Sequence, residues 1–132
     1  MKGFKTNIEK ETLDNTNFRE VLYTGEHLQL VLMCLNPGED IGAETHTTID
    51  QFFRFESGKG KCIINEFEYL VKEGDVIIVP AGSKHNVINT ESNSALKLYT
   101  LYSPPNHEDA IVRNTKADAA NNKEEFNGIT TE

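Results

Sequence analysis

The stretch from Gly38 to Gly58 reads GEDIGAETHTTIDQFFRFESG, and it combines metal-ligand side chains with a strand pattern. Glu44, His46 and Gln51 each bring a lone-pair donor to it. Residues two apart in an extended chain point the same way, so Glu44 and His46 share a face. Imidazole and carboxylate groups suit Fe, Mn, Ni, Co and Zn. We therefore expect one half of a divalent-metal site in this stretch.

A second stretch, from Gly74 to Asn89, reads GDVIIVPAGSKHNVIN and offers His85 as a further ligand. Strand alternation places two further sets of residues on common faces: Gln51 with Phe53 and Phe55, and His85 with Val87 and Asn89. If these faces line the inside of a barrel, one carboxylate, two imidazoles and one amide oxygen can meet. Two histidines with one carboxylate also form the ligand set of non-haem Fe(II) sites. The absence of a thiolate cluster disfavours structural zinc.

The part of the chain around these stretches is predicted to be all β. Short apolar runs alternate with Gly, Pro and Asn turns from residue 18 to 102, and no helical pattern lies between them. The expected strands are Phe18–Tyr23, Leu28–Leu35, Ile49–Phe55, Lys61–Asn65, Phe67–Val71, Asp75–Val79, His85–Asn89 and Ala95–Tyr102. This pattern is typical of a sandwich or barrel, which we place at residues 18–105.

The two ends of the chain are more polar than its middle. We interpret residues 1–17 as an irregular N-terminal arm that forms an edge strand or packs on a partner subunit. Residues 106–132 form a C-terminal extension, in which Thr115 and Asp118 would cap a short helix over Lys116–Asn121. The residues from Asn121 to Glu132 are expected to fray, so the extension is predicted to be partly disordered.

Composition limits the classes of function. The chain has 132 residues, which suits one domain, and its 13 basic and 21 acidic residues give a net charge of −8. Such a charge disfavours nucleic acid as a partner. No apolar run approaches the about 20 residues needed to cross a bilayer, and no secretory leader is visible, so a membrane role is not expected. Cys34 and Cys62 are interpreted as buried thiols of a soluble, cytoplasmic protein.

Side chains outside the two stretches have ordinary structural interpretations. His27 and His107 lie in polar turns and are expected at the surface, as is Lys84 beside His85. Nothing in the chain resembles a nucleophile elbow or another nucleophilic triad. The chemistry is therefore expected at the metal-ligand cluster.

The joint spacing of the two stretches resembles the two motifs of the cupin superfamily, G-x5-H-x-H-x3or4-E-x6-G and G-x5-P-x-G-x2-H-x3-N. The second motif is matched at every position, by Gly74, Pro80, Gly82, His85 and Asn89. The first keeps its spacing from Gly38 to Gly58, with Glu44 in place of the first histidine and Gln51 in place of the glutamate. The wider chain is similar to small single-domain cupins labelled mannose-6-phosphate isomerase-like.

The resemblance implies a double-stranded β-helix barrel of the jelly-roll type with a short C-terminal helix or tail. It also implies a metal at the barrel mouth and a homodimer made through the N-terminal strands. Carried over position by position, the metal ligands are Glu44, His46, Gln51 and His85. The ligand set keeps one negative charge, because the carboxylate has moved from one motif position to the other. Gln51 either ligates directly or hydrogen-bonds a ligand.

Two main functions follow from this site. The first is a metal-dependent enzyme acting on a small polar molecule, with isomerase, decarboxylase or dioxygenase chemistry. Its pocket wall would comprise Phe53, Phe55, Val87 and either Tyr99 or Tyr102. The second is a cupin that binds a sugar or small acid without turnover. A structural dimer with a vestigial site is a third reading, which the retained ligand charge disfavours.

Overall fold

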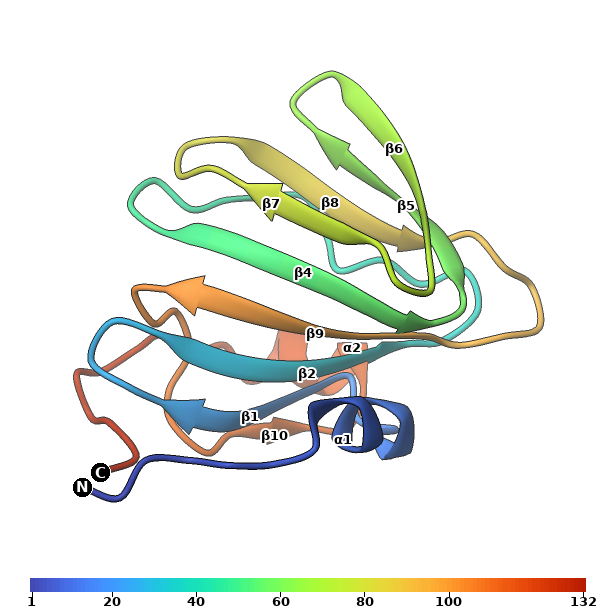
Figure 1. Cartoon of the computed structure of the whole chain (residues 1–132). Helices are drawn as coiled ribbons and strands as arrows, with labels where there is room; N and C mark the ends of the chain where they lie inside the picture. The colour runs from blue at the N-terminus through green and yellow to red at the C-terminus, as the bar shows by residue number, and fades with distance from the viewer.

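The computed structural model describes residues 1–132, which form two antiparallel sheets facing one another (Figure 1). One sheet has six strands in the order β10-β1-β2-β9-β4-β7, and the other has four in the order β3-β8-β5-β6. The elements are α1 (Ile8–Asp14), β1 (Arg19–Thr24), β2 (Gln29–Leu35), β3 (Glu44–Thr45), β4 (Asp50–Ser57), β5 (Lys59–Ile64), β6 (Phe67–Lys72), β7 (Val76–Val79), β8 (Lys84–Asn89), β9 (Leu96–Ser103), β10 (Val112–Arg113) and α2 (Lys116–Asn121). This arrangement confirms the all-β, jelly-roll prediction.

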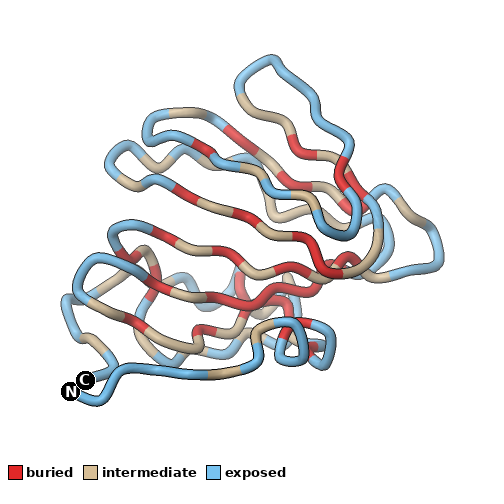
Figure 2. The backbone as a smooth tube through the Cα atoms, viewed as in Figure 1, coloured by how far each residue is buried: buried red, intermediate tan, exposed pale blue.

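The core lies between the sheets, as the alternation of apolar residues predicts. In β9, every second residue from Leu96 to Tyr102 is buried, while the residues between them are partly exposed. Figure 2 shows the same alternation along the neighbouring strands. The largest fully buried apolar side chains include Leu35, Phe53, Phe55, Val87, Leu96 and Leu98. Burial of these side chains is the main stabilising contribution to the barrel.

Two glycines allow the chain to pass close to neighbouring backbone. Gly58 has a φ of +91°, and a Cβ added there would lie 2.4 Å from the carbonyl oxygen of Ala95. Gly60 leaves no room either, because an added Cβ would lie 2.3 Å from the carbonyl oxygen of Ile88. Both close approaches bring β4 and β5 against the segments on either side of the β8–β9 connection. The glycine that ends the first motif is therefore required for packing as well as for its turn.

The N-terminal segment differs from the expected irregular arm or edge strand. Residues Ile8–Asp14 form helix α1, whose N-cap Asn7 accepts a hydrogen bond from the backbone N–H of Lys10 at 3.0 Å. The helix packs against β2, β4 and β9 of the same chain. A cap of this kind stabilises a helix locally. A segment of seven residues is too short for its hydrophobic pattern to predict a helix.

The C-terminal extension is bound to the barrel where fraying was expected. Its β10 pairs with β1 at the edge of the six-stranded sheet. Thr131 donates its backbone N–H to the carbonyl oxygen of Thr24 at 2.9 Å. The backbone N–H groups of Lys2 and Gly3 donate to the carboxylate of Glu132, and the two termini lie side by side (Figure 1). The predicted helix Lys116–Asn121 is confirmed as α2, with Thr115 as its N-cap. Neither helix has the length and apolar composition needed to cross a bilayer.

Candidate metal centre

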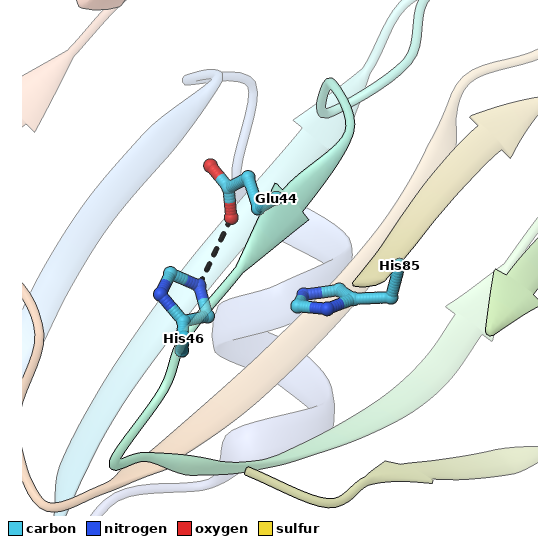
Figure 3. Close-up of side chains that lie close together, drawn as sticks. All are labelled: Glu44, His46 and His85. Atoms are coloured by element: carbon cyan, nitrogen blue, oxygen red, sulfur yellow. Dashed lines mark hydrogen bonds and ion pairs between the residues drawn. The ribbon is translucent and has the colours of Figure 1, made fainter. Parts of the chain in front are cut away.

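The two motif stretches meet at the pairing of β3 with β8. Glu44 of β3 and His85 of β8 are register partners, so their side chains lie on the same face. His46 follows β3, and its carbonyl oxygen accepts the backbone N–H of Gly82 at 2.8 Å. Figure 3 shows the three side chains converging from these two segments. Strand register thus assembles residues that lie about forty positions apart in the sequence.

The ligand atoms of Glu44, His46 and His85 all lie within 4.8 Å of one another. Glu44 Oε2 is 3.1 Å from His46 Nε2, and the two imidazole ring centroids are 5.4 Å apart. His85 is buried, whereas the other two side chains are partly exposed. One carboxylate and two imidazoles at these distances form a donor set suited to a divalent transition metal.

Gln51 of β4 completes the group of four residues indicated by the sequence. Its Oε1 lies 3.1 Å from His85 Nε2, and its Nε2 donates to the hydroxyl of Thr100 at 3.0 Å. The bond to Thr100 turns the amide oxygen toward the histidines. Gln51 is 3% exposed, so its oxygen faces the cluster without competition from bulk solvent.

Hydrogen bonding around His85 points its Nε2 into the cluster. His85 Nδ1 lies 3.0 Å from the carbonyl oxygen of Ser83, and only a protonated Nδ1 can donate to it. Nε2, on the other side of the ring, lies 3.1 Å from Gln51 Oε1. The donor set therefore fits a metal, with His85 held in the tautomer that ligates through Nε2.

Glu44 remains ionised in this setting. Burial by itself would raise the pKa of its carboxyl group, but the hydrogen bond and charge of His46, with the charge of Arg19, lower it below the ordinary value. A carboxylate that keeps its negative charge at neutral pH is ready to bind a cation. Thiolate ligation does not compete, because Cys34 and Cys62 are buried and unpaired, and burial raises the pKa of Cys62 to about 11.

The expected pocket wall is only partly placed at the cluster. Tyr102 is buried beside it, and its ring meets the ring of His46 edge-on with centroids 5.8 Å apart. Phe53 also lies at the cluster, with its ring centroid 6.2 Å from that of His85, whereas Phe55 and Val87 are core residues. None of these side chains, Tyr102 included, lines the adjacent cavity. Tyr99 lies on the opposite face of β9, where its ring is 6.3 Å from that of Phe52. Alternation along β9 separates Tyr99 from Tyr102, so only the second can face the site.

A buried hydrogen-bonded chain leads away from Tyr102. The Tyr102 hydroxyl lies 3.2 Å from His107 Nε2, and His107 Nδ1 lies 2.8 Å from Glu124 Oε1. His107 is 6% exposed, so the expectation that it lies at the surface was wrong. Burial, with the positive charge of Arg19, lowers its pKa, although the hydrogen bond to Glu124 acts the other way. A neutral ring with Nδ1 protonated satisfies both neighbours.

Gln29 holds this chain in place from inside β2. It is fully buried within an apolar run, and its Oε1 accepts the backbone N–H groups of Asn106 and His107. Its Nε2 donates to the carbonyl oxygen of His107 at 2.7 Å. The glutamine at the second position of the apolar run LQLVLMCL was the available sequence signal, because a buried amide requires partners. No spacing rule pointed to Glu124, which lies 17 residues after His107.

A cavity of about 670 Å³ opens beside the cluster and reaches it at Glu44. Its charged and polar lining includes Arg19, Glu44, His107, Lys116, Lys123 and Glu124. The volume suits a small molecule, and the lining suits a polar one. The cavity therefore connects solvent to one of the four candidate ligands, Glu44.

Comparisons with known proteins agree with this fold and site. The family profile described as "Cupin domain" matches residues 31–102, and the chain belongs to the cupin family. It is 48% identical over 124 residues to the uncharacterised protein YrkC of Bacillus subtilis, and 41% identical over 107 residues to the uncharacterised protein L612 of Acanthamoeba polyphaga mimivirus. Those matches cover 89% and 79% of this chain, and 66% and 67% of the relatives.

Among solved structures, the crystal structure of BH2720 from Bacillus halodurans is similar over most of its length. The TM-score is 0.88 at 45% sequence identity, and the match covers 90% of this chain and 94% of that one. The similarity therefore extends beyond the barrel strands to most of the chain.

Proposed function

We propose that this cupin binds a divalent transition metal through Glu44, His46, Gln51 and His85, and acts as an enzyme on a small polar molecule. The observation that carries the proposal is the convergence of one carboxylate and two imidazoles within 4.8 Å, beside an open cavity. Iron, manganese, nickel, cobalt and zinc all accept such ligands. When bound, the metal would supply Lewis acidity or, in the case of iron, oxygen chemistry.

The chain's own residues would bind and orient the substrate. Burial raises the pKa of the Tyr102 hydroxyl, and the nearby charge of Glu44 raises it further, so this group stays protonated. It can donate a hydrogen bond to His107 or to a substrate oxygen. His107 donates its Nδ1–H to Glu124 Oε1, and this hydrogen bond fixes the orientation of the ring. A protonated hydroxyl held beside a metal can serve as a general acid or a hydrogen-bond donor to a substrate.

A mannose-6-phosphate isomerase-like activity is one member of this proposal, suggested by the resemblance of the chain to proteins with that label. A non-catalytic cupin that captures a small molecule in the same cavity is the alternative. The two functions share the metal and the cavity, and turnover distinguishes them.

Elemental analysis tests the metal site directly. Full-length protein purified without added metal, and the same protein reconstituted with Fe(II), Mn(II), Ni(II) and Zn(II), should contain about one equivalent of metal per chain. The double variant His46→Ala/His85→Ala should contain none. His27→Ala is the matched control, since the His27 side chain is 85% exposed and lies outside the site. Wild-type protein without metal after every reconstitution would refute the proposal.

Turnover assays then separate the enzyme from the binder. The metal-loaded protein should convert at least one substrate from a panel of enols, 1,3-diketones, hydroxy acids and sugar phosphates, with oxygen uptake recorded in parallel. Oxygen consumption would assign a dioxygenase, and conversion without it an isomerase or decarboxylase. Tight binding of a panel member with no conversion would favour the non-catalytic alternative.

A further inference from the structure

Arg19, the first residue of β1, is a buried arginine without a counter-ion. It is 8% exposed, and its Nε has no hydrogen-bond partner. No carboxylate lies within 4.0 Å of its guanidinium, whereas Nε of Arg54 lies 2.9 Å from Glu56. A buried charge without a partner is costly, because desolvation is not repaid by an ion pair. The fold therefore retains a guanidinium that forms no ion pair within 4.0 Å, although its charge acts at longer range to lower the pKa values of Glu44 and Glu124.

The guanidinium of Arg19 belongs to the cavity beside the metal-ligand cluster. Arg19 lines that cavity together with Glu44, one of the candidate ligands. The Phe18 ring lies 5.4 Å from the guanidinium carbon and forms part of the same wall. A molecule in the cavity can therefore contact Arg19 and also reach Glu44.

The neighbouring charges explain why Arg19 stays unpaired. Arg113 is its register partner across β1 and β10, and Arg113 takes Glu124 as its own partner at 3.3 Å. Glu124 also binds His107, so its carboxylate is engaged on both oxygens. The nearest candidate ligand carboxylate, Glu44, faces His46. Each acidic group close to Arg19 is committed elsewhere.

The charge arrangement selects the kind of ligand. Besides Arg19, one other partly buried cationic side chain lines the cavity. This is Lys116, which already pairs with Asp40. One unpaired buried cation neutralises one negative charge, and a guanidinium presents two parallel N–H groups that match a carboxylate. Lys123 lines the same cavity, but it is exposed and its charge is screened by solvent, so a phosphate dianion would find only this weaker cation for its second negative charge beside Glu44 and Glu124.

We propose that Arg19 binds the carboxylate of the molecule that occupies this cavity, so that the ligand is a small organic acid and not a neutral sugar or a phosphate ester. The anion site depends on Arg19 alone. The inference rests on the proposed function only in assigning this acid as the substrate at the metal. Arg19 is then the residue that determines ligand class, while Glu44 and the histidines hold the metal.

Matched acids and amides test the assignment. Binding of pyruvate, lactate, pyruvamide, lactamide, mannose and mannose 6-phosphate is measured by calorimetry on metal-loaded and metal-stripped full-length protein. At least one acid should bind wild type tenfold or more tightly than its amide and than either sugar. Arg19→Gln should weaken that acid at least tenfold and leave the amide unchanged, whereas Arg19→Lys should keep part of the affinity. Lys5→Gln, which removes an exposed charge outside the cavity, should change affinity less than twofold.

Specific results would contradict the assignment of Arg19 as a carboxylate-binding residue. No acid binding more tightly than its amide, or unchanged acid affinity in Arg19→Gln, would overturn the inference. Tighter binding of mannose 6-phosphate than of the acids would overturn the assignment of a monoanion. Metal content measured on the same samples separates this inference from the proposed function. Discrimination between acid and amide in a chain that holds no metal would support the Arg19 site while refuting the metal site.

Melting temperature provides a second test, because an Arg19 that binds a ligand and an Arg19 that stabilises the fold predict opposite changes on substitution. Arg19→Met removes an unpaired buried charge and keeps the side-chain volume, so the ligand-free protein should melt at least about 2 °C higher than wild type. The same variant should lose the stabilisation that the bound acid gives to wild type. Lower melting temperatures in both Arg19→Met and Arg19→Gln would show that the guanidinium stabilises the fold, and would overturn the assignment.

Discussion

Glu44 and His85 lie directly opposite one another across β3 and β8, in a strand pair of only two register positions. This pairing brings the carboxylate of the first motif to the imidazole of the second. His46 joins them from just beyond the end of β3, and Gln51 from the facing sheet. The candidate centre is therefore built at the junction of both sheets, where a small shift of register would separate its ligands.

Gln51 should contribute to metal affinity in proportion to the donor strength of its side chain. Gln51→Leu removes the oxygen 3.1 Å from His85 Nε2, and we expect metal affinity to fall about 10- to 100-fold. Gln51→Glu should bind at least as tightly as wild type, because a carboxylate is the stronger donor and Thr100 can donate its hydroxyl to it. Competition with a metal-sensitive chelator measures both. A Leu variant within twofold of wild type would show that Gln51 does not support the metal.

Glu124 should stabilise the fold although it lies in the C-terminal extension. Its carboxylate is 7% exposed and contacts His107 and Arg113. Glu124→Ala leaves both partners without it, and we expect a loss of about 2 kcal/mol in the free energy of unfolding. Glu125→Ala, at the exposed neighbouring residue, should stay within about 0.5 kcal/mol of wild type. Urea denaturation of the three proteins decides the matter, and equal stabilities would mean that the extension is not anchored there.

His107 should make stability depend on pH on the acidic side of neutrality. Burial lowers its pKa below the ordinary value of 6.5, so the unfolded chain takes up this proton more readily than the folded one. The contribution of neutral His107 to the free energy of unfolding is fully present above pH 6.5. It is lost as the pH falls toward the pKa of the folded state, at up to about 1.4 kcal/mol per pH unit. The pKa of Glu124 is also lowered, despite burial, by His107 and the nearby arginines, which adds a loss of stability below about pH 4.5.

Melting temperatures between pH 7.5 and 4.5 test this dependence. His107→Gln should flatten the curve between pH 6.5 and 5, because the replaced side chain no longer titrates. His27→Gln should reproduce the wild-type slope, since the His27 side chain is exposed. An unchanged slope in His107→Gln would assign the acid sensitivity to other groups.

The two glycines that bound the first motif should differ in tolerance. Gly38 has a φ of +77°, but an added Cβ would meet no atom within 4 Å, so Gly38→Ala should cost about 1–2 kcal/mol from its backbone conformation. Gly58→Ala should cost about 1–3 kcal/mol more, because its Cβ would also meet the carbonyl of Ala95. Chemical denaturation compares them. Equal losses would show that the β4–β5 turn can relax away from β9.

A homodimer remains a prediction, but the structure suggests another interface than the N-terminal strands that the resemblance implies, because β1 is already paired on both sides, with β10 and β2. β6 and β7 are terminal strands of the two sheets, and Leu70 and Ile78 on them are 86% and 63% exposed. Unpaired edges with apolar side chains favour contact with a second copy. Light scattering should give a dimer for wild type and smaller species for Leu70→Lys, with Leu28→Lys as an exposed control elsewhere. A monomeric wild type would contradict the prediction.

The fold and the ligand group could be predicted because both depend on local regularities. Period-two alternation and glycine or proline turns define the strands, and motif spacing places His46 two residues after Glu44. Helix α1 was missed because about two turns of helix carry too little periodicity. Tyr99 was included as an alternative to Tyr102 because a sequence does not show which phase of a strand faces inward when both phases contain apolar residues.

By itself, the sequence determined the barrel, the four candidate ligands and their retained negative charge. The tertiary structure alone decided which side chains face one another: Gln51 with His85, His107 with Glu124, and Arg19 with no carboxylate. Alternation is a property of each strand, whereas these relationships arise from the register between strands far apart in the chain. The unpaired charge of Arg19 becomes visible only when every neighbouring carboxylate has been assigned to another partner.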